Sequence, residues 1–200
     1  MIYLGIDTSH TYLAAGLFTE EKVLASVQKE CWKHQSEEIF PAIFTLLEET
    51  GMKVDDIGAV VITKGPGSYT GVRIAMTVAK VLASSKHLPL YTIGTLDLYA
   101  GNETCTVVLD ARSKRVYFGK YENGIRTGEI TARAAAEVEQ EISPDEKVIG
   151  DGILVGRETI FPDIINNFAV TQKRWQKVEQ IHLLEPEYLK TKEAYLVRRD

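Results

Sequence analysis

The sequence has few of the residues that build disulfide-bonded or metal-dependent proteins. It contains only two cysteines, Cys31 and Cys105, which lie far apart and lack the spacing of metal ligands. We therefore expect two reduced thiols in a cytoplasmic protein. The histidines share no regular spacing and give no metal-binding pattern either: His10, His34, His87 and His182. Both absences argue against a metal site in this chain.

Long apolar runs and an excess of positive charge are absent as well. No run approaches the ~20 apolar residues that a membrane-spanning helix needs. The N-terminal segment has no basic region, and Asp7 interrupts its apolar run, so we expect no signal peptide. The net charge of −5 gives no overall positive field for a phosphate backbone. These absences predict a cytoplasmic protein that does not hold nucleic acid tightly by itself.

The chain instead has the composition of an ordinary folded protein, 44% hydrophobic and 26% charged. In the first half, short apolar runs predict strands, and apolar residues at helical spacing predict helices. The expected strands are 2–6, 12–18, a run from 23, 57–62 and 90–93, and the expected helices are 37–49, 72–85 and 96–100. We expect Ser36 to cap the first helix, Pro41 to kink it or delay its start, and Gly51 to end it.

The same order of elements begins again at Thr104. The expected strands are 106–109, 116–121, 125–131 and 147–149, the expected helices are 134–142, 153–161 and 163–169, and 185–190 is a strand end before a frayed terminus. Each copy opens with an apolar strand that ends in an aspartate, Asp7 or Asp110. We therefore predict an α/β fold of two duplicated βββαβα lobes, residues 1–101 and 102–200. Coincidence is the alternative, because three strands before a helix is a common order.

A glycine-rich segment, Gly65 to Gly71, precedes the helix 72–85. Ser68 or Thr70 is expected to cap this helix, and the free N–H groups at its start, together with Arg73, would suit an anion. The alternative is a tight turn whose glycines permit close packing and need no ligand. The segment is not a Walker A loop, because the Gly-Lys-Ser/Thr ending is missing.

The segment from Gly65 to Ile74 resembles the signature of the TsaB (YeaZ) family. Further matches occur in family order along the chain: Ile6–Ser9, His34 with Ser36–Glu37, Asp110–Arg112 with Val116–Tyr117, and Pro186–Lys190. Tyr69 stands where the family commonly has phenylalanine, Gln35 is an extra residue before Ser36, and 153–180 matches little. The glycine-rich segment is the most specific of these matches.

The resemblance implies a fold of the actin, Hsp70 and sugar-kinase (ASKHA) type, in agreement with the duplication. It also implies a heterodimer with the catalytic paralogue TsaD and assembly with the ATPase TsaE. Together, these proteins transfer a threonylcarbamoyl group, from an adenylate made by TsaC, to an adenosine of tRNA. Contact of this chain with tRNA would then be indirect.

Asp7 and Asp110 stand where ATPases of this fold hold metal-bound phosphates. The turns that follow them, 8–11 and 111–114, contain no glycine, and the second is bulky and basic. Side chains at every position obstruct the close backbone approach that phosphate binding needs, so we predict weak or absent ATPase activity. The alternative is that both aspartates only bond to turn amides. The candidate nucleotide or anion contacts are Asp7, Gly65, Gly67, Ser68, Thr70, Arg73, Asp110 and Arg112.

The metal-binding histidines of the catalytic paralogue have no counterpart in this chain. They lie four residues apart on the short helix after the glycine-rich segment, where this sequence has Thr95 and Tyr99. Neither residue is a good ligand for a soft or borderline metal. We therefore predict no metal, no catalytic residue and no required cofactor in this chain.

The helix 72–85 is apolar over most of its circumference, so we expect it to be covered on more than one side. By resemblance, this helix and the helix 37–49 dock against TsaD. The predicted interface comprises Phe40, Phe44, Val72, Arg73, Met76, Ala79, Lys80 and Ala83. The alternative is burial between the two lobes of the same chain.

Three functions therefore compete at the level of sequence. The leading hypothesis is a non-catalytic scaffold or activator subunit of TsaD. A small-molecule kinase or ATPase would need glycine-rich phosphate loops, and a peptidase would need a His-Glu-x-x-His helix or a triad. Homodimerisation of the free chain and ATP or ADP bound at the joint with the partners both remain open.

Overall fold

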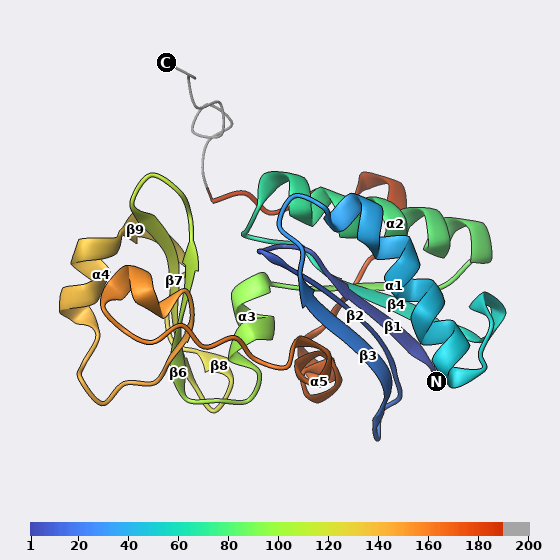
Figure 1. Cartoon of the computed structure of the whole chain (residues 1–200), viewed down its shortest axis with the longest axis horizontal. Coiled ribbons are helices and arrows are strands. Elements are labelled where there is room, and N and C mark those ends of the chain that lie inside the picture. Colours follow the sequence, from blue (N-terminus) through green and yellow to red (C-terminus); the bar gives the residue numbers. More distant parts are fainter. Residues whose placement is uncertain (190–200) are drawn as a thin grey trace, which may run out of the picture.

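The computed structural model describes residues 1–189, which form two β-sheets with helices around and between them (Figure 1). The first sheet has the order β11-β5-β4-β1-β2-β3. Its strands are β1 (Tyr3–Asp7), β2 (Tyr12–Phe18), β3 (Val23–Glu30), β4 (Ala59–Thr63), β5 (Leu90–Ile93) and β11 (Gln176–Lys177). β1 pairs with β2 in antiparallel and with β4 in parallel orientation, so its residues are buried on both faces.

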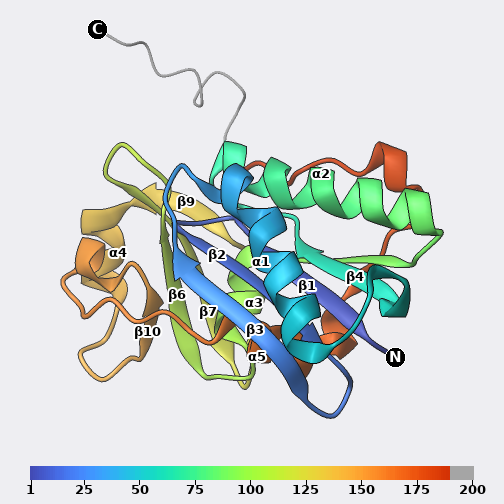
Figure 2. The same ribbon diagram turned by 45° about the vertical axis from the view of Figure 1, so that its right-hand side comes forward.

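Helices cover both faces of the first sheet. Two long helices, α1 (Gln35–Thr50) and α2 (Tyr69–Lys86), pack on one face and bury an aliphatic cluster that includes Leu4, Ile6 and Leu46 (Figure 2). On the other face, the short helix α5 (Ile164–Val170) packs against β1, β2 and β3, and the short helix α3 (Thr95–Ala100) lies between α5 and the second sheet. Their cluster is rich in aromatic side chains and joins the two lobes into one core.

The second sheet has a shorter version of the same topology. Its path is β10-β6-β7-β8, and β9 also pairs with β7. Its strands are β6 (Cys105–Asp110), β7 (Arg115–Glu122), β8 (Ile125–Arg126), β9 (Thr131–Ala134) and β10 (Val148–Gly150). β6 pairs with β7 in antiparallel and with β10 in parallel orientation, as β1 does with β2 and β4. This correspondence confirms the predicted duplicated α/β fold.

The last helix of the second repeat is missing from its own lobe. After α4 (Ala135–Glu141) and β10, the chain forms only a short 3₁₀ helix, Gly152–Val155, which ends at Gly156 with a φ of +67°. The predicted helix 153–161 is therefore wrong, whereas the predicted helix 163–169 is α5. α5 belongs in space to the first sheet, against β1, β2 and β3.

Other local predictions were wrong in detail. α1 begins at Gln35 after His34, so Ser36 is not its cap, and the helix runs without a late start through Pro41. Gly51 ends it in the left-handed conformation, as predicted. α2 begins before the predicted residue 72, because Ser68 caps it by accepting a hydrogen bond from the Gly71 amide. The predicted strand 125–131 is divided into β8 and β9.

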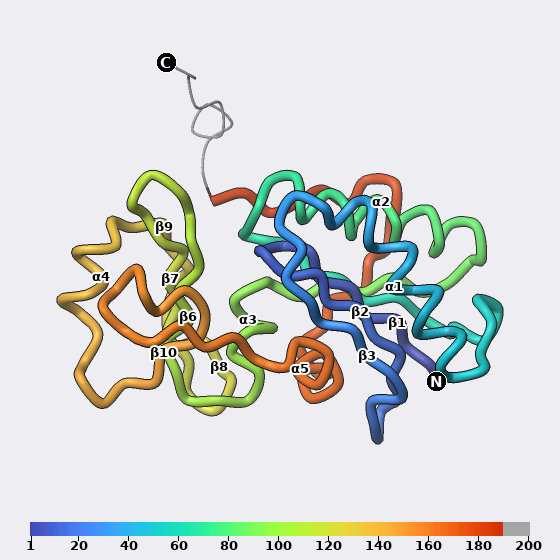
Figure 3. The backbone as a smooth tube through the Cα atoms, viewed as in Figure 1, coloured from blue at the N-terminus to red at the C-terminus, as the bar shows by residue number. Residues whose placement is uncertain are grey.

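The C-terminal segment returns to the first lobe (Figure 3). β11 pairs with β5, the 3₁₀ helix Ile181–Leu183 packs beside α2, and the Glu187 amide donates to the Lys64 carbonyl at 2.7 Å. Residues 185–189 do not form the predicted strand end, and Lys190 with the frayed terminus lies outside the described residues. The predicted boundary after residue 101 separates α3 from β6, but α5 and β11 pack with the first sheet; the division into folding units stays a prediction. No helix within residues 1–189 has the length and apolar character that crossing a bilayer requires.

Candidate functional site

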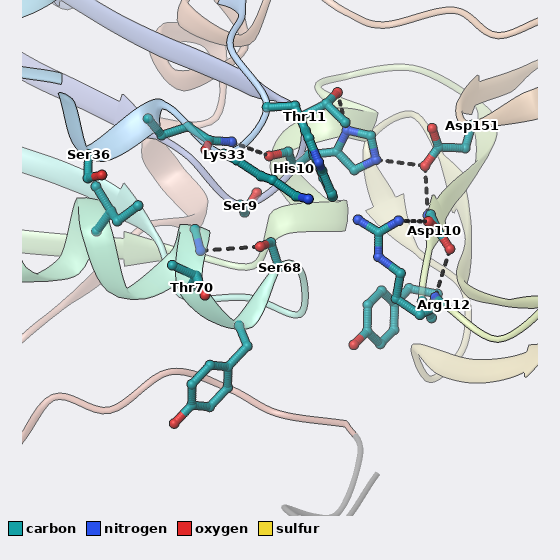
Figure 4. A pocket seen from close by; sticks show the side chains of 17 residues that line it. Ser9, His10, Thr11, Lys33, Ser36, Ser68, Thr70, Asp110, Arg112 and Asp151 are labelled. Carbon is teal, nitrogen blue, oxygen red and sulfur yellow. Dashed lines mark hydrogen bonds and ion pairs between the residues drawn. The ribbon is translucent and has the colours of Figure 1, made fainter. Parts of the chain in front are cut away.

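A cleft of about 580 Å³ lies between the two lobes (Figure 4). Its first-lobe wall comes from the β1–β2 loop, the loop before α1 and the start of α2, and its second-lobe wall comes from the residues after β6 and β10. This is where proteins of two similar α/β lobes bring two strand ends together. Of the candidate anion contacts, only Ser68, Thr70, Asp110 and Arg112 line the cleft.

Asp7 is held inside the first lobe and does not line the cleft. Its carboxylate is fully buried and accepts hydrogen bonds from the Ser9 amide at 3.0 Å, the Thr63 hydroxyl at 2.5 Å and the Tyr99 hydroxyl at 3.3 Å. Burial and the nearby Asp7 carboxylate raise the pKa of Tyr99 well above its ordinary value, so the phenol stays a donor. The arrangement favours the interpretation of Asp7 as a residue that ties the turn after β1 to β4 and α3.

Asp110 lies at the cleft but is already paired. It accepts a hydrogen bond from the Arg112 backbone amide and another from its guanidinium, both at 2.7 Å. The guanidinium also lies 4.4 Å from the ring centroid of Trp32, which belongs to the other lobe. The turn continues in the left-handed conformation through Arg112, Ser113 and Lys114. A charged side chain therefore occupies the place where a phosphate loop would need open backbone.

A second contact joins the lobes across the cleft. Nε2 of His10, after β1, lies 2.7 Å from Oδ2 of Asp151, after β10. Both side chains are largely buried, and the same carboxylate oxygen accepts the Asp110 amide at 2.6 Å. We call the two contacts, His10 with Asp151 and Trp32 with Arg112, the interlobe latch. The sequence did not predict this latch, because no local pattern pairs residues that lie 141 positions apart.

The glycine-rich turn packs tightly against the turn after β1. A Cβ atom on Gly67 would lie 2.4 Å from the Ser9 carbonyl oxygen, and one on Gly71 would lie 2.0 Å from the Thr8 carbonyl oxygen. The Thr8 hydroxyl donates to the Gly71 carbonyl at 2.7 Å. Gly65 has a φ of +107°, and a Cβ atom on it would lie 2.5 Å from the Glu187 carbonyl oxygen in the C-terminal segment. The geometry favours the close-packing interpretation of these glycines over direct contact with a ligand.

The positions compared with the metal-binding histidines of the paralogue are Thr95 and Tyr99. Both side chains are fully buried on α3, in the core between the sheets. Within residues 1–189, no group of three or more His, Cys, Asp or Glu side chains is placed to hold a metal ion.

A groove of about 350 Å³ lies between α1 and α2 and adjoins the cleft. Nine residues line this α1–α2 groove: Ser36, Ile39, Phe40, Tyr69, Thr70, Arg73, Ile74, Thr77 and Val78. Phe40 is 53% exposed, and Phe44, one turn further along α1, is 58% exposed. Ser36, Tyr69, Thr70 and Ile74 line both the cleft and the groove, so the two hollows share a wall.

The predicted interface residues fall into two groups. Phe40, Phe44 and Arg73 are exposed at or beside the α1–α2 groove, and Met76 and Lys80 line a further hollow between α2 and residues 182–188. The remaining three do not reach the surface, because they pack in the aliphatic core under α2: Val72, Ala79 and Ala83. Their burial removes these three residues from the predicted interface. The apolar character of α2 thus serves mainly the core of its own lobe.

Two repeated α/β lobes around a central cleft place the protein in the ASKHA class of folds. The family model described as TsaD, tRNA N6-adenosine threonylcarbamoyltransferase, matches residues 25–162. The chain belongs to this family, and its resemblance to the TsaB (YeaZ) members is confirmed.

The similar proteins support this assignment. Over 132 residues, the chain is 38% identical to the tRNA threonylcarbamoyladenosine biosynthesis protein TsaB of Bacillus subtilis, covering 62% of this chain and 58% of that protein. It is 33% identical to TsaB of Escherichia coli, covering 66% and 61%. The matches thus span less than two thirds of these relatives. The structure of YeaZ from Pseudomonas aeruginosa has the same fold, with a TM-score of 0.76 at 23% identity over 94% of this chain and 99% of that one.

Proposed function

We propose that the chain is a non-catalytic partner subunit in the synthesis of threonylcarbamoyladenosine in tRNA, and that it docks a TsaD-type protein on the α1–α2 groove. The observation that carries the proposal is the exposure of Phe40 and Phe44 beside a groove on the outer face of the first lobe. Large aromatic side chains are the residue type that anchors protein interfaces. The biosynthetic role is supported by the names of the TsaB relatives.

The internal pairing of the side chains at the cleft supports a non-catalytic role. The Asp7 carboxylate accepts hydrogen bonds from within its own lobe. The Arg112 guanidinium pairs with Asp110 and lies over the Trp32 ring. A nucleotide phosphate would have to displace the interlobe latch before reaching backbone amides on both sides. We propose that the chain needs no cofactor of its own, acts in the cytoplasm and meets tRNA only through its partners. TsaE is the second proposed partner, with ATP or ADP at the joint of the complex as an open alternative.

A reconstituted modification reaction tests the proposal. Matched TsaC, TsaD and TsaE are incubated with tRNA, ATP, threonine and bicarbonate, with and without this chain. Modified nucleoside is expected only when the chain is present, and the chain alone should hydrolyse no ATP. Equal product without the chain would contradict the proposed function. ATP hydrolysis by the chain alone that disappears in Arg112→Ala would favour the kinase-like alternative.

A further inference from the structure

The α1–α2 groove contains a single charged side chain in an otherwise uncharged lining. The apolar part consists of Ile39 and Phe40 from α1 with Ile74 and Val78 from α2, and the only ionised residue among the nine is Arg73. Arg73 is exposed and lies one helical turn after Tyr69. A partner that covers this groove must therefore remove one positive charge from water.

Among residues 1–189, no acidic side chain pairs with Arg73, and an aromatic ring holds its side chain in place. Its guanidinium carbon lies 5.5 Å from the ring centroid of Tyr69, and that ring stacks on Tyr188 with centroids 5.2 Å apart. Within the part of the chain that the structure describes, Arg73 takes part in no hydrogen bond or ion pair, whereas Arg112 is paired with Asp110. Stacking limits the motion of the side chain and leaves its N–H donors unused. The Arg73 guanidinium is therefore free to bind an anionic group of another molecule.

We propose that Arg73 recognises a carboxylate on the chain that occupies the α1–α2 groove, and so determines which partner binds there. This inference rests on the proposed function, in which the groove is the docking surface. The occupant has an apolar ridge that covers Phe40 and Ile74, with an aspartate or glutamate beside it. A guanidinium matches a carboxylate with two parallel hydrogen bonds, which gives orientation as well as affinity.

The same charge argues against a second copy of this chain as the occupant. A two-fold symmetric interface places the same patch on both sides. The groove lining contains no carboxylate, so two grooves brought together would bury two Arg73 side chains without an acidic lining residue to pair them. Glu37, on the same helix as Phe40, is already paired with His34 at 3.2 Å. A different chain that supplies its own acidic residue satisfies Arg73 better.

Titration calorimetry of the full chain with the TsaD-type protein of the same genome tests the inference. Arg73→Gln should weaken binding by about 30-fold, because it leaves the partner's carboxylate buried and unpaired. Arg73→Glu should weaken it further. Raising the salt concentration should weaken wild-type binding more than binding of Arg73→Gln. Lys22→Glu, with the same charge change on an exposed residue of the β2–β3 turn, should bind like the wild type.

Two controls separate failure of this inference from failure of the proposed function. If Phe44→Ala weakens binding and both Arg73 variants do not, the groove docks the partner but Arg73 does not select it, which overturns the inference alone. Sedimentation of the chain without its partner tests whether a second copy of the chain binds at the groove. If wild type mixed with Arg73→Glu forms dimers more readily than either does alone, Arg73 faces its own copy and the inference is wrong. The modification reaction, run with and without this chain, tests the proposed function independently of both results.

Discussion

At the scale of single residues, the close packing of the glycine-rich turn depends on residues that have no side chain. Gly71 sits in the first turn of α2, where a Cβ atom would lie 2.0 Å from the Thr8 carbonyl oxygen. We expect Gly71→Ala to lower the free energy of unfolding by about 1–3 kcal/mol, because backbone rather than a flexible side chain must move. Urea unfolding measures the change. Gly128→Ala is the matched control, since its Cβ would meet nothing within 4 Å; similar losses in both variants would contradict the packing argument.

The two thiols differ in their surroundings, which gives a second prediction at this scale. Burial, and then the nearby Glu103 carboxylate, raise the pKa of Cys105 to about 11. At pH 8 only roughly one Cys105 side chain in a thousand is then a thiolate, and the fraction rises about tenfold per pH unit until pH approaches the pKa. We expect alkylation of Cys105 to be slower than that of the half-buried Cys31 and to accelerate as pH rises. Mass spectrometry of the labelled peptides measures both, and faster labelling of Cys105 at pH 8 would contradict the prediction.

At the scale of elements, α1 presents two aromatic rings that its own fold does not use. Phe40 and Phe44 are more than half exposed, while Ile39, Ile43 and Leu46 on the same helix are buried. The double change Phe40→Ser and Phe44→Ser should leave the unfolding free energy within about 0.5 kcal/mol, because little apolar area is buried there. It should weaken binding of the TsaD-type partner by about 30-fold or more. Ile125→Ser, a similarly exposed residue on β8, is the control for both readouts; equal effects on binding would exclude the groove as the docking surface.

Sequence patterns predicted the elements whose signals are local. The apolar runs that end in Asp7 and Asp110 became β1 and β6, the stop at Gly51 was predicted from residue type, and the structure selects Ser68 from the two expected caps of α2. The interlobe latch was not predicted, since no local pattern joins His10 to Asp151. The burial of Val72 and Ala79 was also not predicted, because the sequence of an apolar helix does not show which of its sides packs on the sheet. Those features depend on packing between distant segments.

At the scale of the whole molecule, the interlobe latch holds the two lobes at the cleft. Asp151→Asn combined with Arg112→Gln removes the charge from both contacts. We expect faster amide hydrogen exchange at residues 9–12 and a loss of about 1–3 kcal/mol in unfolding free energy, because both contacts cross the cleft and one is largely buried. Exchange in α4, away from the cleft, should stay unchanged. Lys29→Gln, which breaks the exposed pair with Glu38 inside the first lobe, is the control; an equal effect on residues 9–12 would contradict the role of the latch.

The position of α5 in the chain has a consequence for how the protein is made. One face of the first sheet is covered by α5, and that helix is synthesised only after the entire second sheet. While the ribosome is still adding residues 105–163, the aromatic side of the first sheet, including Phe18, has no α5 to cover it. The first lobe emerges first but is completed last. During translation, this sheet face is therefore the one on which a chaperone would most readily act.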